Sequence, residues 1–462
     1  MNLDLVIRNG TLVIPRVGTR AGDIGVRDGK IAAIEEPGSG LDAPEVIDAT
    51  GLHVFPGSID PHAHIALGGG GGLDEYRSET GAAALGGVTS IYYMMMTGGS
   101  YDDLLAEHDA VASASAHIDY GFHPTLMTQQ HVDEVELIRE RWGVRSCKYF
   151  MHFRGDEGKY LGVEGTHDGM LYLMLKKLAA TGDVLMIHAE NPEVVWVLRD
   201  ELKASGRDDL AAWDDVRPPF VEAEAIAKAS YFANHLGCDV YFVHVSTAES
   251  LDEIRTVRTR YADLPIAAET CPHYLTHSTD SDVGVLGKVN PPLRRPEHLE
   301  ALWAAIQDGT IDTLGSDHVA RLRSSKVGSI WDVSAGFPCA PLTMPVLISE
   351  GFHERGIPLE RIAELTSKRP AELMRCAASK GDLQVGLDAD LALIDLETAR
   401  SVDAGWLGTY SDYSLYEGWD LRGWSRHTFV RGEAVVRDGE LVGTPGHGAP
   451  IRPSIDAAVP AA

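Results

Sequence analysis

The histidine pair His62 and His64 is the feature whose residue types and spacing point most directly to chemistry. The apolar residues before the pair predict a strand, and residues i and i+2 of a strand face the same side. Both imidazoles would therefore lie together at the carboxyl end of that strand, where they could share a metal ion. With 19 histidines in 462 residues, about one such pair is expected by chance. The pair is therefore evidence for a metal site only if residues at other strand ends could bind the same metal.

Four further predicted strands end in a residue that could bind metal, namely Lys148, His188, His244 and Asp317. Imidazole and carboxylate ligands suit Zn, Mn, Ni or Fe better than Ca or Mg. A protonated lysine repels a cation, but burial and neighbouring positive charges lower the pKa of a lysine. A neutral amine can take up CO2, and the resulting carbamate is an anion able to bridge two metals.

Each of these residues also has an ordinary structural explanation when it is taken alone. A single histidine at a strand end is commonly a core or rim residue, Lys148 could extend its amine to solvent, and Asp317 could cap a helix. All of these explanations would have to hold together at five strand ends. A shared metal site is the simpler hypothesis.

The middle of the chain has the alternating pattern that would bring these residues together. Short apolar runs alternate with helical stretches such as 170–180, 223–236 and 297–307. Eight such units predict an α/β fold, a (β/α)8 TIM-type barrel over residues 54–380, with its active site at the carboxyl ends of the strands. The expected strands are 54–64, 89–96, 121–125, 146–151, 184–188, 240–245, 266–270 and 312–317.

The two ends of the chain share a sequence pattern that differs from that of the middle. Residues 1–53 and 381–462 contain short β-rich runs separated by Asn-Gly and Asp-Gly turns, which favour hairpins. We expect both ends to form one small β-sandwich domain. The glycine run at 68–72 is expected either to form a loop over the barrel mouth or to act as a simple connector.

The composition of the chain indicates which kinds of partner and which cellular compartment to expect. A net charge of −28 disfavours binding to nucleic acid or to anionic membranes. No run approaches the ~18 apolar residues of a membrane helix. The five scattered cysteines lack a C-x-x-C pair and fit a reducing cytoplasm.

A set of motifs, in order along the chain, resembles the cyclic amidohydrolases of the amidohydrolase superfamily, the hydantoinase/dihydropyrimidinase, allantoinase and dihydroorotase group. The resemblance implies a hydrolase with two divalent metals, Zn or else Mn, Ni, Fe or Co. It assigns His62, His64 and Asp317 to one metal, His188 and His244 to the other, and N6-carboxylated Lys148 as the bridge. It also implies that Asp317 is the catalytic acid and base, and that the protein is a homotetramer or homodimer. The motifs are segments 56–64, 82–89, 148–151, 187–191, 244–246, 269–275, 290–294, 316–318 and 386–391.

Substrate contacts differ from the family pattern although the metal ligands match it. Dihydroorotases carry an arginine where this chain has Ala66. Hydantoinases carry a tyrosine where this chain has Phe153. They also bind the ring through a serine and an asparagine, and the equivalent positions in this chain are Asn290 and Ala335. Lost hydrogen bonds cost about 1–3 kcal/mol each, so we expect a changed substrate. His152 is a further candidate contact, and Phe337 and Trp331 are candidate pocket residues or ordinary core residues.

The expected activity is therefore hydrolysis of a C–N bond in a cyclic amide, imide or ureide. The alternatives are an allantoinase- or dihydroorotase-like activity, other superfamily chemistry such as deamination, or a non-catalytic interaction protein on the same scaffold. Six matching ligand positions favour the enzyme, and Lys148 together with the segment at 290–294 favours a cyclic amidase.

Overall fold

Eight parallel strands form a closed barrel in the computed structural model, which describes residues 2–67, 71–155 and 161–453. The strands make a three-stranded and a five-stranded sheet. Backbone pairing of Thr125 with Lys148 and of Ala63 with His318 joins the two sheets into a ring. The predicted TIM-type barrel is confirmed. Its strands are β6 (Ser58–His64), β7 (Val88–Met95), β8 (Asp119–Pro124), β9 (Ser146–Phe150), β10 (Val184–His188), β11 (Val240–Phe242), β12 (Ile266–Thr270) and β13 (Thr313–Leu314).

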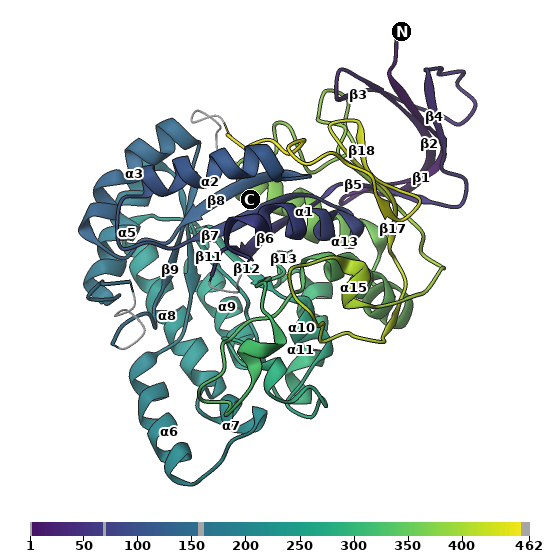
Figure 1. Ribbon diagram of the computed structural model, residues 1–462. Coiled ribbons are helices and arrows are strands. Elements are labelled where there is room, and N and C mark those ends of the chain that lie inside the picture. Colours follow the sequence, from purple (N-terminus) through teal and green to yellow (C-terminus); the bar gives the residue numbers. More distant parts are fainter. Residues whose placement is uncertain (1, 68–70, 156–160, 454–462) are drawn as a thin grey trace.

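Helices surround this ring and bury their apolar faces against it (Figure 1). The three helical stretches expected from sequence correspond to α5, α8 and α11. The outer helices are α1 (Glu75–Leu85), α2 (Tyr101–Ser115), α3 (Gln129–Trp142), α5 (Asp168–Thr181), α8 (Pro219–Leu236), α9 (Ala248–Arg260) and α11 (Pro296–Asp308). Further helices lie in the connections or follow the barrel: α6 (Pro192–Ala204), α7 (Leu210–Asp215), α10 (Pro272–Thr276), α12 (Thr343–Val346), α13 (Leu359–Ala363), α14 (Arg369–Leu373) and α15 (Ala404–Leu407).

Both chain ends contribute to one nine-stranded mixed sheet, at the upper right of Figure 1. Its buried apolar residues form a core separate from that of the barrel. The predicted small β domain of the two ends is thus present, and its limits at residues 53 and 381 stay a proposal. The strands are β1 (Leu5–Ile14), β2 (Gly18–Arg27), β3 (Lys30–Glu35), β4 (Glu45–Asp48), β5 (His53–Pro56), β14 (Leu391–Ile394), β17 (Ser425–Val430), β18 (Glu433–Arg437) and β19 (Glu440–Leu441), and the short β15 (Arg400–Ser401) and β16 (Asp420–Leu421) pair separately.

The expected first barrel strand at 54–64 is two strands in the structure. β5 pairs with β1 and β14 in the end sheet, whereas β6 pairs with β7 in the barrel. The chain changes sheets at Gly57, where a Cβ atom would lie 2.2 Å from Thr89 Oγ1. Both halves are largely buried although β6 carries several polar residues, so hydrophobicity alone does not reveal the change of sheet.

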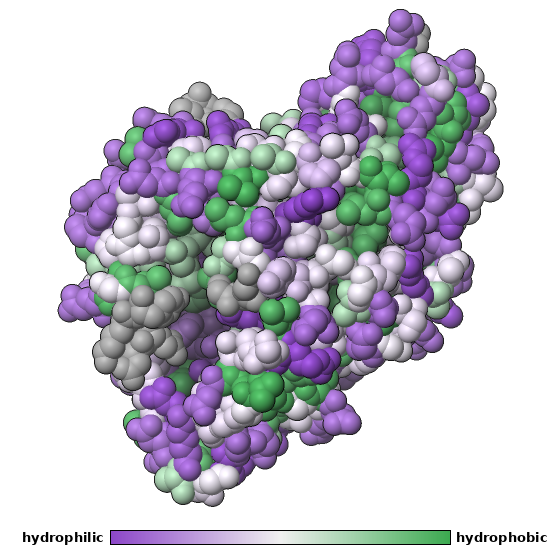
Figure 2. All heavy atoms as spheres, viewed as in Figure 1, coloured by the Kyte–Doolittle hydropathy of each residue, from purple (hydrophilic) through white to green (hydrophobic). Residues whose placement is uncertain are grey.

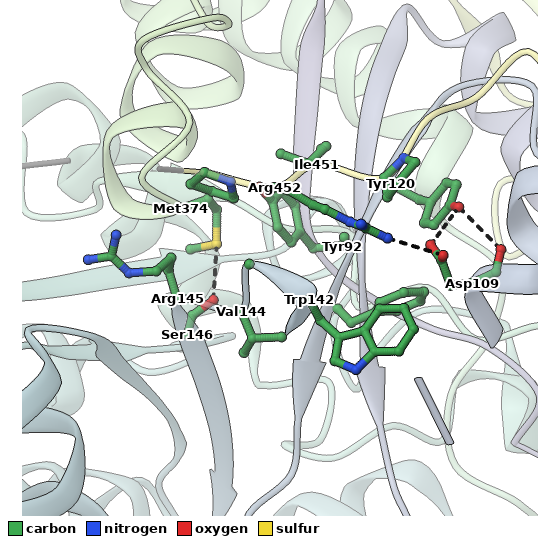
Figure 3. Close-up of a pocket in the computed structure, with 15 residues that line it drawn as sticks. Tyr92, Asp109, Tyr120, Trp142, Val144, Arg145, Ser146, Met374, Ile451 and Arg452 are labelled. Atoms are coloured by element: carbon green, nitrogen blue, oxygen red, sulfur yellow. Dashed lines mark hydrogen bonds and ion pairs between the residues drawn. The ribbon is translucent and has the colours of Figure 1, made fainter. Parts of the chain in front are cut away.

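A C-terminal segment closes the amino-terminal end of the barrel. Tyr120 of β8 donates its N–H to Ala449 O at 3.1 Å and accepts from Ile451 N–H at 2.7 Å. Figure 3 shows Arg452 reaching toward Asp109, at 3.2 Å, beside Tyr120. The pocket here has a volume of only about 10 Å³. This end of the barrel is therefore packed, and a substrate site must lie elsewhere.

The surface is largely hydrophilic, and its apolar residues gather in separate patches, one of them over the mixed sheet (Figure 2). Within the described ranges, we find no helix with the length and apolarity needed to cross a membrane. Of the glycine run at 68–72, residues 68–70 lie outside the described residues.

A buried ion network fastens the barrel to the end sheet. Lys380 Nζ lies 2.7 Å from Asp119 Oδ2 of β8 and 2.5 Å from Asp390 Oδ2. Arg431 adds a second cation to Asp119, and its own N–H donates to Asp390. Lys380, Asp119 and Asp390 are each at most 5% exposed. Removing one partner from such a network leaves buried charge uncompensated.

We predict that Lys380→Met lowers the free energy of unfolding by about 3–5 kcal/mol, because it strands two buried carboxylates. Lys30→Met is the matched control, since its ion pair with Asp388 is largely exposed and is worth about 0–1 kcal/mol. Thermal and urea denaturation would measure both variants. Equal, small losses in the two variants would contradict a fastening role for Lys380.

Candidate metal centre

The barrel brings all six predicted ligands to one end. β6 supplies His62 and His64, β9 supplies Lys148, and β10 ends at His188. His244 follows β11 and Asp317 follows β13. Parallel strands place their carboxyl ends on one face of a barrel, as the sequence prediction required. Each of the six residues is at most 7% exposed.

The first group contains His62, His64 and Asp317. Asp317 Oδ1 lies 3.1 Å from His64 Nε2 and 3.3 Å from His62 Nε2. One ligand atom from each residue lies within 4.8 Å of the others, as a shared cation requires. The Asp317 backbone adopts a left-handed conformation, with φ of 47°, and its N–H donates to His62 O at 2.9 Å. Strain of this kind is commonly found at functional sites.

His188 and His244 form the second group, and their ring centroids are 4.4 Å apart. His62 links the groups, because its ring lies 5.4 Å from that of His244. His244 also has a left-handed backbone, with φ of 44°. The imidazoles of the two groups therefore lie together at the carboxyl ends of the barrel strands, and we call this ligand cluster the floor of the site.

Lys148 lies fully buried on β9, next to His188 on β10. Its Nζ atom makes no hydrogen bond within the described part of the chain and lies 4.8 Å from the centroid of the Phe150 ring. Burial lowers the pKa of Lys148 to about 8, although Asp317 and Glu269 act in the opposite direction. A substantial fraction of the amine is therefore neutral near physiological pH, as carbamate formation requires.

Two buried carboxylates orient the histidines. Glu269 Oε1 accepts from His62 Nδ1 at 2.7 Å and from the His244 N–H at 3.2 Å. Glu190 Oε2 lies 2.6 Å from His188 Nε2. A carboxylate on one ring nitrogen fixes the tautomer and leaves the other nitrogen for a metal. The sequence analysis assigned neither glutamate a role, although an acid within the apolar stretch Ile266–Thr270 was a signal.

Burial is the main influence on the charge of the imidazoles. It lowers the pKa of His62, His188 and His244 well below the ordinary histidine value, and the charge of Lys148 adds to the effect. All three rings are therefore neutral at physiological pH. Neutral imidazole is the form that binds metal.

A cavity of about 320 Å³ opens onto this cluster. Four predicted contacts line it, namely His152, Phe153, Asn290 and Ala335. The ring of His152 lies 4.0 Å from that of His188, centroid to centroid.

The structure places the other two candidate pocket aromatics in packed regions. Phe337 is buried against the His273 ring, and Trp331 packs beside Trp213. Neither belongs to the described cavity lining.

Several lining residues were missed by sequence reasoning. Leu67, Met96, Phe150 and Val289 supply apolar wall, and Arg321 supplies a cation. Met96 is the last residue of the expected strand 89–96, and Phe150 lies one residue before the end of the expected strand 146–151. Their positions near strand ends were therefore an available signal. Arg321 lies in an irregular loop, whose path depends on tertiary contacts that no local pattern reports.

The chain is similar to known hydrolases over nearly its whole length. A profile of the amidohydrolase family matches residues 224–435. The chain is 35% identical over 464 residues to a D-hydantoinase of Geobacillus stearothermophilus, covering 96% of this chain and 95% of that protein. It is 35% identical over 457 residues to an allantoinase of Rubrobacter xylanophilus, covering 96% of each. A crystal structure of dihydropyrimidinase from Brevibacillus agri superimposes with a TM-score of 0.90 at 31% identity, covering 98% of this chain and 99% of the other. The chain belongs to the amidohydrolase family, in its group of hydantoinases, dihydropyrimidinases and allantoinases.

Proposed function

We propose that the protein is a binuclear metal-dependent hydrolase that opens the ring of a cyclic amide, imide or ureide. The observation that carries this proposal is the convergence of six buried ligand residues at one end of the barrel, four of which line a single cavity. Relatives named D-hydantoinase and allantoinase support the same reaction class. A non-catalytic role would not explain why six residues able to bind metal are buried together at one end of the barrel.

The ligands divide into two sets in this proposal. His62, His64 and Asp317 hold one metal, and His188 and His244 hold the other. The residues fit such a centre, because His64 Nδ1 and Lys148 Nζ are buried without a hydrogen-bond partner among the described residues. Mixed imidazole and carboxylate donors favour Zn, with Mn, Ni, Fe or Co as alternatives.

Lys148, once carboxylated to a carbamate, would hold both metals and supply a bridging anion. Its neutral amine adds to the carbon of CO2 and releases a proton, and the product carries one negative charge. The depressed pKa of Lys148 supports this step. Burial disfavours the competing ammonium form more strongly than the nearby Asp317 and Glu269 favour it.

Asp317 moves the proton. When bound, two divalent metals supply a hydroxide nucleophile at neutral pH and polarise the substrate carbonyl. The Asp317 carboxylate takes up a proton as the new C–O bond forms. It then delivers this proton to the ring nitrogen, which leaves poorly unless it is protonated. Glu269 and Glu190 keep the imidazoles in place throughout.

The cavity wall indicates a substrate that differs from those of the named relatives. Phe153 and Ala335 offer no side-chain hydrogen bond, whereas His152 and Asn290 are polar. We propose these four residues as substrate contacts. Allantoinase-like activity is the second candidate, supported by the similarity to an allantoinase, whereas a dihydroorotase-like activity would lack the arginine that Ala66 replaces.

We also propose a homo-oligomer, either a tetramer or a dimer, on the family resemblance. A cytoplasmic location is supported by the five cysteines, which are free and buried.

A hydrolysis screen of the zinc-loaded protein tests the proposed function. It should cover hydantoins, dihydropyrimidines, allantoin, dihydroorotate, cyclic imides and lactams. We expect ring opening of at least one class, and its loss after chelation with recovery on metal addition. A protein that carries two metals and opens none of these rings would contradict the proposal.

Lys148→Ala is expected to lose metal and activity, because it removes the bridging anion. Short carboxylic acids such as acetate should restore part of both by occupying the vacated space. Elemental analysis and turnover measure the effect, with Lys176→Ala on the exposed face of α5 as the control. Full metal content and activity without added acid would exclude the bridge.

Asp317→Asn is expected to lower turnover by about 100- to 10,000-fold, because the amide cannot carry the proton. The amide oxygen can still bind metal, so metal content should fall much less than turnover. Asp332→Asn, at an exposed position, is the control. Wild-type turnover in Asp317→Asn would rule out Asp317 as the proton carrier.

A further inference from the structure

The rim of the cavity carries an arginine that the proposed chemistry does not use. Arg321 lines the cavity and is half-buried, whereas the metal ligands at the floor are buried. Its Nη1 donates to Leu67 O at 2.6 Å, and its Nε donates to Ala335 O at 3.4 Å. Leu67 follows β6 and Ala335 lies beyond β13. The guanidinium is thus held between two loops at the mouth of the cavity.

The rim and the floor of the cavity differ in charge. The formal charges of the described lining belong to Asp317 and Arg321. Asp317 is a metal ligand in the proposed function, and a guanidinium stays charged at every relevant pH. The cavity with its metals bound would therefore attract an anion.

The charge of Arg321 acts on a buried lysine in the wall behind it. Lys326 is buried, and its Nζ donates to Lys288 O at 3.1 Å. Burial, with the positive charges of Arg321 and Lys288 adding to it, lowers the pKa of Lys326 to about 6. Lys326 is therefore largely neutral at pH 7, and Arg321 supplies the positive charge at the rim.

We propose that the substrate is a cyclic amide, imide or ureide with a carboxylate substituent, and that Arg321 binds this carboxylate at the rim. The inference rests on the proposed function, because the ring must lie over the metal centre while its substituent reaches the mouth. The planar guanidinium fork matches a carboxylate in geometry and charge. Arg321 would then determine specificity and take no part in bond cleavage.

A matched pair of ligands tests this assignment, hydantoin-5-acetate and its neutral amide, hydantoin-5-acetamide. With the zinc-loaded protein, calorimetry should show tighter binding of the acid. Arg321→Met should weaken binding of the acid, and raise its KM, by about 10- to 100-fold, since a charge-assisted hydrogen bond is lost. Binding of the amide should be unchanged, and Arg321→Lys should keep part of the preference for the acid.

Two further variants separate recognition from loop structure. Arg323→Met removes an exposed cation of the same loop and should leave both affinities unchanged. Ser411→Ala removes the hydroxyl that accepts a hydrogen bond from the backbone N–H of Arg321 at 2.9 Å. This change loosens the loop but keeps the positive charge of Arg321. If Arg321 only braces the loops, Arg321→Met and Ser411→Ala will weaken acid and amide alike.

Two binding results would overturn the inference. One is no preference for the acid in the wild-type protein. The other is a preference that survives in Arg321→Met, as expected if the carboxylate binds the metals instead. These binding results decide the inference even if neither compound is hydrolysed, whereas failure of the whole hydrolysis screen counts against the proposed function.

Discussion

Desolvation at the barrel floor keeps the candidate ligands in the protonation states that a metal centre needs. It keeps the imidazoles of His62, His188 and His244 neutral and brings the pKa of Lys148 down to about 8. Buried polar groups without partners cost about 1–3 kcal/mol each, and a ligand shared by the groups would offset that cost. Glu269 and Glu190 relieve part of that cost and leave the remaining ring nitrogens directed at the site. The rest of the barrel serves to exclude water from this cluster.

The architecture separates the part of the site that makes a nucleophile from the part that selects a substrate. The floor residues come from strand ends, whose positions are fixed by backbone pairing around the ring. The rim residues come from loops, held by contacts such as that between Arg321 and Leu67. Loops can change without disturbing the strands. A shared reaction and a divergent substrate are compatible with one scaffold for this reason.

The sequence predicted the floor well because its signals are local. The spacing of His62 and His64 and the residues at strand ends follow from the two-residue period of a strand. The glutamate within Ile266–Thr270 could have been recognised in the same way. The sheet change at Gly57 could not, because it depends on Thr89 being close in space. Phe337 and Arg321 lie in the region after β13, where tertiary contacts alone decide which side chains meet the cavity.

A crystal structure of the zinc-loaded protein, with anomalous difference maps recorded at the zinc edge, tests the central claim most directly. We expect two peaks at the carboxyl ends of the barrel strands, one beside His62, His64 and Asp317 and one beside His188 and His244. Density should also extend beyond Nζ of Lys148 and bridge the two peaks. An ordered cluster with no metal, or two metals beside an unmodified Lys148, would contradict the account.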